Sequence, residues 1–272
     1  MKIKKQALLI GALGGLGSAT TLLLSQNGWH VFAADNQHDI LDHFKQKDNI
    51  TPVFMDVTKT DTIEKAFQTL SAQTPRLDAI IHVAGVLKIG SLAEIPVSEL
   101  EKALDINLLG VYRVNQQFFS MLLQGKGRIL VLSSEVARQT AAPFNGIYTI
   151  SKYALEAYSD ALRRELAFLG IKVIKVQPGP FKTDMTKNAE QLFIEAQKQS
   201  VYFKNNLSKG ISYLPRVYKK ANDPVRVARI IRKALESSRP RTAYTVKIDA
   251  SRAVLDCLPV RWADKIIQRV LS

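Results

Sequence analysis

Tyr148 and Lys152 are the two residues of this 272-residue sequence whose types and spacing best suit chemistry. At positions i and i+4 of a helix, their side chains share one face. A free tyrosine has a pKa of roughly 10, and a nearby ammonium group lowers that pKa by favouring the phenolate. The pair therefore predicts a tyrosine that acts as a general acid or base near neutral pH. The spacing alone is weak evidence, because a lysine-rich chain produces such a pair by chance.

A glycine-rich segment near the N-terminus suits the binding of a phosphate group. Gly11, Gly14, Gly15 and Gly17 lie between an apolar run of strand length, residues 7–10, and a segment of helical composition. Glycine lets the backbone turn tightly and approach a pyrophosphate at the N-terminus of the following helix. The spacing is G-x-x-x-G-x-G rather than the commoner G-x-G-x-x-G. The segment indicates a dinucleotide-binding turn, with close packing of strand against helix as the alternative.

Asp35 ends the second predicted strand, residues 29–34, at the distance from the glycines where a ribose-binding carboxylate is found. A carboxylate there accepts hydrogen bonds from both ribose hydroxyls of NAD and repels the 2′-phosphate of NADP. Neither Asn36 nor the glycine segment supplies a cation to hold that phosphate. We therefore expect NAD(H) to be preferred over NADP(H), with an ordinary surface-turn aspartate as the alternative.

The elements that must position these residues alternate along the chain. We expect strands at 7–10, 29–34, 52–55, 77–83, 128–132 and 171–176. We expect helices at 18–26, 60–72, 97–123 and 148–169, another starting at Asp223-Pro224, and an amphipathic helix over 262–271. Near-continuous apolar strands that alternate with helices are typical of a parallel sheet covered on both faces.

The predicted fold class is therefore α/β, with one domain over residues 1–272. We expect a Rossmann-type, doubly wound parallel sheet with helices on both faces and a C-terminal helical extension. Residues 184–222 have weak periodicity, and long connections of this kind often carry binding function, so we expect them to bind the substrate. Tyr202, Phe203, Tyr213 and Tyr218 in this segment either line an apolar pocket or pack structurally. Residues 223–272 form a basic C-terminal extension.

These motifs together resemble the classical short-chain dehydrogenase/reductase family over essentially the whole chain. The further motifs that carry the resemblance, in the family's order, are Asp56-Val57, Ala84-Gly85, Asn107, Ser133-Ser134 and Pro178-Gly179 with Thr183. The resemblance implies an oxidoreductase that transfers a hydride between NAD(H) and a hydroxyl or carbonyl group. Ile10 stands where the family usually has threonine, and His82 and Val83 replace two asparagines. The second departure puts a strand-stabilising hydrogen bond in question.

The resemblance implies four catalytic residues: Asn107, Ser134, Tyr148 and Lys152. In these roles Tyr148 takes the hydroxyl proton, and Lys152 lowers its pKa and holds the nicotinamide ribose. Ser134 polarises the substrate oxygen, and Asn107 positions a water that links Lys152 to solvent. Ser134 lies 14 residues before Tyr148, one more than is usual in the family, so Ser133 is the alternative.

The resemblance also implies a set of cofactor-binding residues. These are Gly11, Gly15, Leu16, Gly17, Asp35, Asp56, Val57, Ala84, Gly85, Tyr148, Lys152, Pro178, Gly179 and Thr183. Residues 154–165 and the extended C-terminus resemble the retinol- and hydroxysteroid-type branch, which implies a lipophilic alcohol or ketone, steroid-, retinoid- or acyl-like. A homodimer or homotetramer is the expectation from the family. The alternative function is a non-catalytic NAD-sensing or scaffold protein on the same fold.

The charge of the chain is unusual and uneven. The net charge is +14, and residues 182–272 contribute 19 Lys/Arg and 8 Asp/Glu, or +11. Such a segment suits an anionic membrane surface, a nucleic acid or an acidic substrate, or is simply a solvated face. With no recognised nucleic-acid motif, we expect no nucleic-acid partner. The single Cys257 and the four histidines lack metal-ligand spacing, so we expect no metal. We expect a cytoplasmic protein that can also associate with a membrane surface as a peripheral protein.

Overall fold

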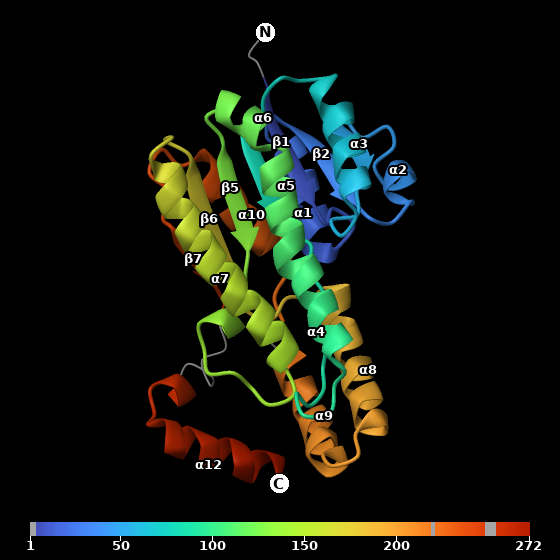
Figure 1. Cartoon of the computed structure of the whole chain (residues 1–272), viewed down its shortest axis with the longest axis vertical. Coiled ribbons are helices and arrows are strands. Elements are labelled where there is room, and N and C mark those ends of the chain that lie inside the picture. The colour runs from blue at the N-terminus through green and yellow to red at the C-terminus, as the bar shows by residue number, and fades with distance from the viewer. Residues whose placement is uncertain (1–3, 219–220, 248–253) are drawn as a thin grey trace.

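The computed structural model describes residues 4–218, 221–247 and 254–272. Its strands form one seven-stranded sheet in the order β3-β2-β1-β4-β5-β6-β7, with every neighbouring pair parallel (Figure 1). This confirms the predicted α/β class with a Rossmann-type sheet. The strands are β1 (Lys5–Ile10), β2 (Trp29–Asp35), β3 (Ile50–Phe54), β4 (Ala79–His82), β5 (Arg128–Leu132), β6 (Lys172–Pro178) and β7 (Ala243–Val246).

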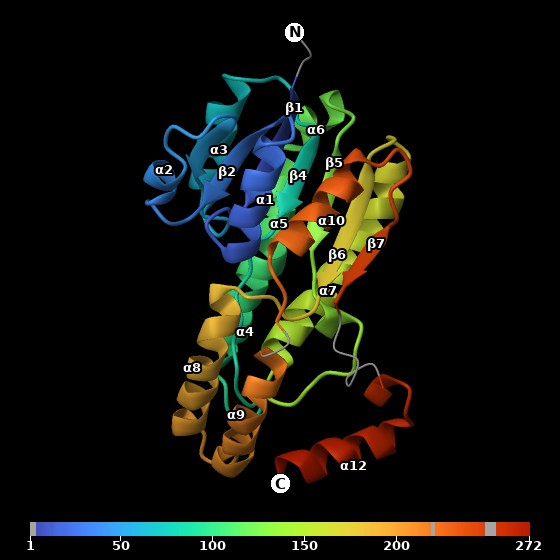
Figure 2. The ribbon, with the colours of Figure 1, turned by 180° about the vertical axis from the view of Figure 1, so that it is seen from behind.

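Helices cover both faces of the sheet, as the apolar strands require. Along β1, Leu8 and Ile10 join the core on one face, whereas Ala7 and Leu9 join the core on the other. Figure 1 shows the first face, covered by α3 (Thr60–Ser71), α5 (Gly110–Gln117) and α7 (Gly146–Ala167). Figure 2 shows the second, covered by α1 (Gly15–Ser25) and α10 (Val225–Glu236). The short α2 (Ile40–His43) lies beside the edge of β3.

The two edge strands depart most from the sequence prediction. β3 contains Pro52, which pairs with Ala33 and is tolerated because β3 lies at the edge of the sheet. β7 was not expected at all. Its four residues are too few and too exposed to give a periodic signal, and the strand exists because it pairs with β6, with Lys175 opposite Ala243.

The long helix expected over 97–123 is divided in the structure. α4 (Val97–Leu104) runs into a π-helical turn over Asp105–Leu109, which is followed by α5 and then by α6 (Phe119–Gln124). Such turns often occur at functional sites because they shift the register of one side chain. Here the shifted segment contains Asn107, which is fully buried.

The segment predicted to bind substrate forms two helices beyond the carboxyl edge of the sheet. α8 (Asp184–Gln199) and α9 (Lys204–Tyr218) pack against each other, away from the N-terminal end of β1 (Figures 1 and 2). Thr183 caps α8, since its hydroxyl accepts a hydrogen bond from the Thr186 N–H. The last helix, α12 (Val260–Leu271), lies against α9.

α10 begins at Val225, just after the expected start at Asp223-Pro224, with Pro224 as its N-cap residue. The carboxylate of Asp223 accepts a hydrogen bond from the Val225 N–H at 2.8 Å. Among the described residues, no helix combines the length and the apolar character needed to span a bilayer. Lys219 and Lys220 lie outside the described residues.

Candidate active site

A cleft of about 1210 Å³ opens at the carboxyl edge of the sheet. It lies where the strand order reverses between β1 and β4, which is where ligands bind in doubly wound folds. It brings together most of the residues singled out in the sequence: Gly11, Gly15, Leu16, Asp35, Asp56, Val57, Ala84, Gly85, Ser133, Ser134, Tyr148, Lys152, Pro178, Gly179 and Thr183. Gly17 and Asn107 are not among the lining residues.

The glycines of the first turn serve two different purposes. Gly11 has φ 87°, and a Cβ there would lie 2.6 Å from the Ala84 backbone nitrogen. A Cβ on Gly17 would lie 1.9 Å from the Gly11 carbonyl oxygen, so Gly17 is required for packing within the turn. Gly14 instead precedes α1 with no side chain capping the helix N-terminus, and Gly14 and Gly15 both line the cleft. The phosphate-binding and close-packing interpretations therefore apply to different glycines of the same motif.

The N-terminus of α1 has the features that a dinucleotide phosphate needs. Its first N–H groups have no side-chain cap and border the cleft, and a helix N-terminus favours negative charge. A Cβ on Gly15 would lie 3.2 Å from the Thr183 methyl carbon, so a side chain at position 15 would fill the space between the turn and α8. The cradle fits a pyrophosphate because glycine keeps it open.

Asp35 lies at the end of β2, buried but bordering the cleft. One carboxylate oxygen accepts a hydrogen bond from the Leu13 N–H at 3.0 Å, and the other accepts one from the Gln37 N–H at 3.3 Å. Each oxygen keeps a second acceptor position. The lysines that line the described cleft, Lys102 and Lys152, come from α4 and α7, away from the glycine turn and β2. The Asp35 carboxylate therefore has acceptor positions at the cleft and no lysine of the cleft lining beside it on β2 or the glycine turn.

Asp56 uses its carboxylate to build a turn. Its Oδ1 accepts hydrogen bonds from the Thr58 N–H at 3.0 Å and from the Thr58 hydroxyl at 2.7 Å. This turn leads into α3 and holds Val57 at the wall of the cleft. The pair therefore shapes one side of the site.

Tyr148, Lys152 and Ser134 meet at the deep end of the cleft. Tyr148 in the first turn of α7 and Lys152 in the second bring the Lys152 Nζ to 5.6 Å from the centre of the Tyr148 ring. The Tyr148 hydroxyl is hydrogen bonded to the Ser134 side chain. Lys152 is 4% exposed, and its ammonium group donates a hydrogen bond to the Leu132 carbonyl oxygen at 3.0 Å. A phenol, a hydroxyl and an ammonium group thus face one small volume.

The pKa of Tyr148 corrects one expectation. Lys152 was expected to lower this pKa, but desolvation of the hydroxyl raises it to about 12, against the lowering effect of the Ser134 hydrogen bond. Desolvation likewise lowers the pKa of Lys152 to about 8, while the charge of Glu156 raises it. Burial in the protein alone therefore favours the neutral form of both groups.

The two serines at the end of β5 have different surroundings. Ser134 is hydrogen bonded to Tyr148, whereas the buried Ser133 hydroxyl has no hydrogen-bond partner among the described residues. The geometry favours Ser134 as the serine that works with Tyr148. The extra residue before Tyr148 lies in the connection from Ser134 to α7, which begins with a short 3₁₀ turn (Glu135–Ala137).

Asn107 is buried and does not itself line the cleft. Its Oδ1 accepts a hydrogen bond from the Val86 N–H at 2.8 Å, and its Nδ2 donates to the Val86 carbonyl and to the Ser151 hydroxyl. A Cβ built on Gly85 would lie 3.2 Å from Asn107 Oδ1 and 3.4 Å from Lys152 Nζ. Asn107 and Lys152 therefore approach the same point, and glycine at position 85 leaves room for both.

His82 replaces the expected asparagine with a different hydrogen bond. Its Nε2 is 2.8 Å from the Asn115 Oδ1, and the Asn115 amide donates to the Tyr158 hydroxyl at 3.1 Å. Burial lowers the pKa of His82 to about 4, so the ring is neutral at pH 7. The chain thus retains a polar link from β4 to α5 and α7.

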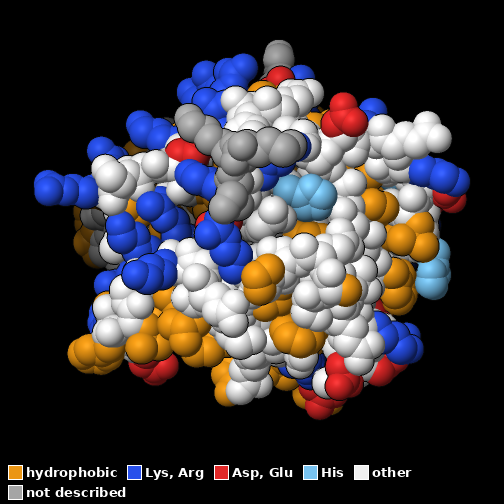
Figure 3. Space-filling view, turned by 90° about the horizontal axis from the view of Figure 1, so that it is seen from above, with side chains coloured by type: hydrophobic (Ala, Val, Ile, Leu, Met, Phe, Trp, Pro, Cys, Tyr) orange, Lys and Arg blue, Asp and Glu red, His pale blue; other side chains and the backbone are white. Residues whose placement is uncertain are grey.

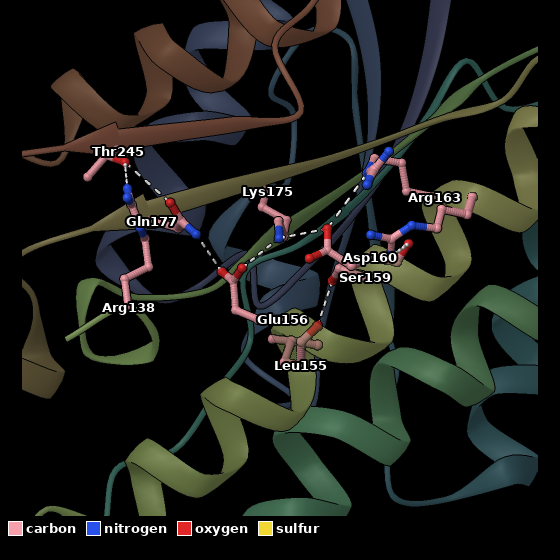
Figure 4. A network of polar contacts seen from close by, with 10 residues as sticks. Arg138, Leu155, Glu156, Ser159, Asp160, Arg163, Lys175, Gln177 and Thr245 are labelled. Atoms are coloured by element: carbon pink, nitrogen blue, oxygen red, sulfur yellow. Dashed lines mark hydrogen bonds and ion pairs between the residues drawn. The ribbon is translucent and has the colours of Figure 1, made fainter. Parts of the chain in front are cut away.

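A second buried lysine, Lys175 of β6, contacts α7, and the sequence analysis missed it. The Lys175 ammonium group is 2.7 Å from Glu156 and 2.8 Å from Asp160 (Figure 4). Gln177 donates to the other Glu156 oxygen at 2.8 Å. Glu156 is one helical turn beyond Lys152, so the i, i+4 spacing was a usable signal. This network is called the Lys175 network below.

The segment predicted to bind substrate contributes part of the cleft. Asp184, Met185, Thr186, Asn188 and Leu192 of α8 line it. Tyr202, Phe203 and Tyr213 do not line it: Tyr202 is 79% exposed, and Phe203 packs against Phe144. The side chain of Tyr218 lies outside the described part of the structure. No group of three or more potential metal ligands occurs within the described ranges.

Known proteins resemble this chain in sequence and in fold. The family described as short chain dehydrogenase matches residues 5–192. The "Uncharacterized oxidoreductase YbbO" of Escherichia coli (strain K12) is 30% identical over 98% of this chain and 95% of its own length. "Retinol dehydrogenase 7" of Rattus norvegicus is 30% identical over 97% of this chain and 87% of its own.

A solved structure gives the same result for the fold. A short-chain dehydrogenase from Burkholderia cenocepacia J2315, in complex with NADP, has a TM-score of 0.73 and 20% identity, with 100% of both chains covered. The matched family spans the glycine turn, the Tyr148 and Lys152 pair and most of α8. The chain therefore belongs to the short-chain dehydrogenase family, a nucleotide-binding family of oxidoreductases with a Rossmann-type fold.

Proposed function

We propose that this protein is an NAD(H)-dependent dehydrogenase or reductase that acts on the hydroxyl or carbonyl group of a lipophilic alcohol or ketone. The observation that supports it best is the meeting of Tyr148, Ser134 and Lys152 at the deep end of the cleft. A nicotinamide dinucleotide, when bound, supplies the hydride acceptor or donor and, in its oxidised form, a positive charge. Everything else in the proposal is done by the protein's own side chains.

Tyr148 is proposed to exchange the proton of the substrate hydroxyl. Its pKa of about 12 means that the hydroxyl is protonated near neutral pH, which suits protonation of the oxygen when a ketone is reduced. In the direction of alcohol oxidation, a cation near the phenol must lower this pKa before Tyr148 accepts a proton. Lys152, which remains largely charged below its pKa of about 8, is one such cation.

Ser134 and Asn107 are proposed to set the geometry for this transfer. The Ser134 hydroxyl is hydrogen bonded to Tyr148, so the two hydroxyl groups lie close together. A substrate oxygen placed between them would accept a hydrogen bond from each hydroxyl. Asn107 fixes the Val86 backbone beside the Lys152 ammonium group. We propose that Asn107 keeps a water in contact with Lys152, as the family resemblance implies.

The dinucleotide is proposed to lie from the glycine turn to Tyr148. Gly11, Gly14, Gly15 and Leu16 would hold the pyrophosphate, and Asp35 would accept hydrogen bonds from the adenosine ribose. Ala84, Gly85, Lys152, Pro178, Gly179 and Thr183 would border the nicotinamide half.

NAD is proposed over NADP because Asp35 has no basic neighbour in the glycine turn or at the end of β2. The Burkholderia cenocepacia protein was solved with NADP, so the fold alone does not exclude NADP. Initial rates with NAD and NADP in parallel test this point. Asp35→Ser should raise the relative rate with NADP at least tenfold, while Asp39→Ser, an exposed neighbour, should leave it unchanged. An NADP preference in the wild-type protein would contradict the role of Asp35.

A lipophilic substrate is proposed because apolar side chains contribute to the cleft wall. Leu87, Met185 and Leu192 line the same cleft as Tyr148. The similarity to "Retinol dehydrogenase 7" supports the same class. The direct test is a panel of sterols, retinoids, 3-hydroxyacyl compounds and small secondary alcohols, followed by NADH absorbance. Turnover of small polar alcohols alone would contradict the lipophilic assignment, and no turnover of any compound would contradict the dehydrogenase itself.

A homo-oligomer is proposed because α5 and α7 leave large apolar side chains exposed on adjacent helices. Tyr112 and Tyr153 are 46% and 44% exposed, and Ile150 is 40% exposed. Exposed apolar patches of this kind mark protein interfaces. Light scattering should give a mass above 30.3 kDa, and Tyr112→Glu with Tyr153→Glu should return the protein to a monomer.

A further inference from the structure

The C-terminal helix α12 carries three parallel stripes of side chains. Ala263, Ile267 and Leu271, spaced by four residues, form the first stripe. Ala263 is 2% exposed, and the Leu271 carbonyl oxygen accepts a hydrogen bond from the Asn206 amide of α9 at 2.8 Å. This stripe attaches α12 to the substrate segment and uses only part of the helix's apolar surface.

The second stripe is apolar and exposed. Trp262, Ile266 and Val270 have the same four-residue spacing and are 65%, 43% and 38% exposed. A tryptophan and two branched aliphatic side chains in a row on the solvent side of a helix cost free energy in water. The first stripe has already satisfied the packing of α12 onto the protein, so this face has another use.

The third stripe is basic and borders the second. Arg261, Lys265 and Arg269 each precede one residue of the exposed apolar stripe by one position, and all three are exposed. Within the described ranges none of the three has an acidic ion-pair partner. A tryptophan-containing apolar stripe flanked by Lys and Arg is the arrangement of a helix that lies in a membrane interface.

The position of α12 extends this surface to the substrate segment. α12 lies at the end of the molecule farthest from the N-terminus, beside the turn between α8 and α9 (Figures 1 and 2). Val201 and Tyr202 in that turn are 73% and 79% exposed. Figure 3 shows the opposite end, where basic side chains also gather, so charge alone does not distinguish the two ends. The combination of an exposed apolar stripe with an adjacent basic stripe does.

We propose that α12 docks this protein onto an anionic lipid bilayer, with Trp262, Ile266 and Val270 entering the interface and Arg261, Lys265 and Arg269 contacting lipid phosphates and carboxylates. A second copy of this chain, with its net charge of +14, would bring like charge against the basic stripe. A nucleic acid would leave the apolar stripe unburied. A bilayer satisfies both stripes at once.

Docking would orient the α8–α9 end toward the membrane, so that a lipophilic substrate reaches the cleft from the bilayer. This consequence rests on the proposed function, whereas the docking itself does not. Vesicle binding is measured without cofactor or substrate, so its failure and the failure of the dehydrogenase are separate results.

Tryptophan fluorescence of the full chain gives a direct measurement. The chain has 2 tryptophans, and Trp29 is 2% exposed, so a change of environment on docking is reported by Trp262. With vesicles of phosphatidylcholine and phosphatidylserine we expect a blue shift of the emission and cosedimentation, both weakened by high salt. With phosphatidylcholine alone we expect much weaker binding. No binding to either vesicle would overturn the proposal.

Variants separate the two stripes. Replacing Arg261, Lys265 and Arg269 together by Gln should weaken binding about 100-fold, given the usual contribution of each basic residue at an anionic surface. Ile266→Ser with Val270→Ser should remove the blue shift while Trp262 remains as the reporter. The matched controls are Lys45, Lys59 and Lys65 together to Gln, and Phe168→Ser, which removes an apolar side chain that is 91% exposed on α7's C-terminal side.

The outcomes are distinguishable. Because the changed side chains are exposed, we expect each variant to fold. Thermal unfolding checks that it does. Binding that is unaffected by the α12 variants, or reduced equally by the controls, would overturn the proposal. A lower molecular mass of the Ile266→Ser and Val270→Ser protein in light scattering would also overturn it, since the apolar stripe would then be a protein–protein interface.

Discussion

Two buried lysines beside α7 have opposite electrostatic surroundings. Lys152 donates to the Leu132 carbonyl, has no carboxylate within ion-pair distance among the described residues, and burial lowers its pKa to about 8. Lys175 is also largely buried, and burial alone lowers its pKa, but the hydrogen bonds that its ammonium group donates to Asp160 and Glu156 outweigh this effect and raise the pKa. The first lysine lines the cleft, and the second does not.

The different surroundings of the two ammonium groups indicate a different role for each lysine. A buried ammonium group held by two carboxylates is electrostatically satisfied, and its role is to connect β6 to α7. A buried ammonium group without a carboxylate partner can act electrostatically on a group bound in the cleft. Its desolvation lowers the free energy of unfolding. Glu156 links the two, since it pairs with Lys175 and its charge also raises the pKa of Lys152.

The largest expected effect is on activity. Tyr148→Phe removes the proposed proton donor and should lower kcat by roughly 10²- to 10⁴-fold. Lys152→Met should cause a loss of similar size, because the charge beside Tyr148 disappears. Lys175→Met should keep kcat within about tenfold of wild type if it folds. Steady-state NADH assays with the best alcohol of the panel provide the numbers. A Lys175→Met protein as inactive as Lys152→Met would remove the distinction between the two lysines.

The next effect is on stability, and it has the opposite order. Lys175→Met leaves Glu156 without its cation and Asp160 with Arg163 alone, and it should lower the free energy of unfolding by about 2 kcal/mol. The loss is smaller than for a fully buried pair because Asp160 is partly exposed. Lys152→Met removes an unpaired buried charge and should leave the protein at least as stable as wild type. Denaturant unfolding at pH 7 measures both. A large loss of stability in Lys152→Met would contradict the comparison.

A smaller effect is expected in the pH dependence of stability. Lys152 titrates at about 8 in the folded protein and at 10.5 when unperturbed, so between these values the unfolded chain binds more protons. The free energy of unfolding should therefore gain about 1.5 kcal/mol from this group between pH 8 and pH 9.5. The gain should be missing in Lys152→Met. If the two proteins show parallel curves, Lys152 is not perturbed as described.

The smallest expected effect separates the two carboxylates of the Lys175 network. Glu156→Gln removes the charge that raises the pKa of Lys152, so the alkaline limb of the pH–rate profile should move to lower pH. Asp160→Asn, which also loses a contact with Lys175, should leave that limb in place because the charge of Asp160 does not act on Lys152. Equal shifts in both variants would show that the network acts only through the fold.

The sequence predicted the inner sheet well and the edges poorly. The five inner strands, β1, β2, β4, β5 and β6, were predicted because each is a largely buried apolar run that can be recognised from the local sequence. The edge strand β3 is half-buried and contains Pro52, and its observed bounds, Ile50–Phe54, differ from the expected 52–55. β7 was missed because its pairing with β6 depends on tertiary contacts. The single helix expected over 97–123 contains a π-helical turn, and this turn depends on the contact of Asn107 with Val86, far away in the sequence.

The sequence predicted which residues meet at the candidate site, but it did not predict how burial changes their pKa values. Motif order placed Ser134, Tyr148 and Lys152 correctly in one cleft. The sign of the Tyr148 pKa shift was wrong, because an i, i+4 spacing gives the neighbour but not the burial. The Lys175 network was missed because Lys175 appears in the sequence as one of many basic residues, and its burial depends on the packing of β6 against α7, which the sequence does not show locally.

The ionisation of the two lysines tests this account most directly. Lysine ε-carbon resonances can be followed by NMR as the pH rises, with Lys152→Met and Lys175→Met used for assignment. The account predicts that Lys152 loses its proton at about pH 8 and that Lys175 does so above 10.5. Titration of Lys152 near 10.5 would contradict it, since the ammonium group beside Tyr148 would then be solvated or paired like any surface lysine.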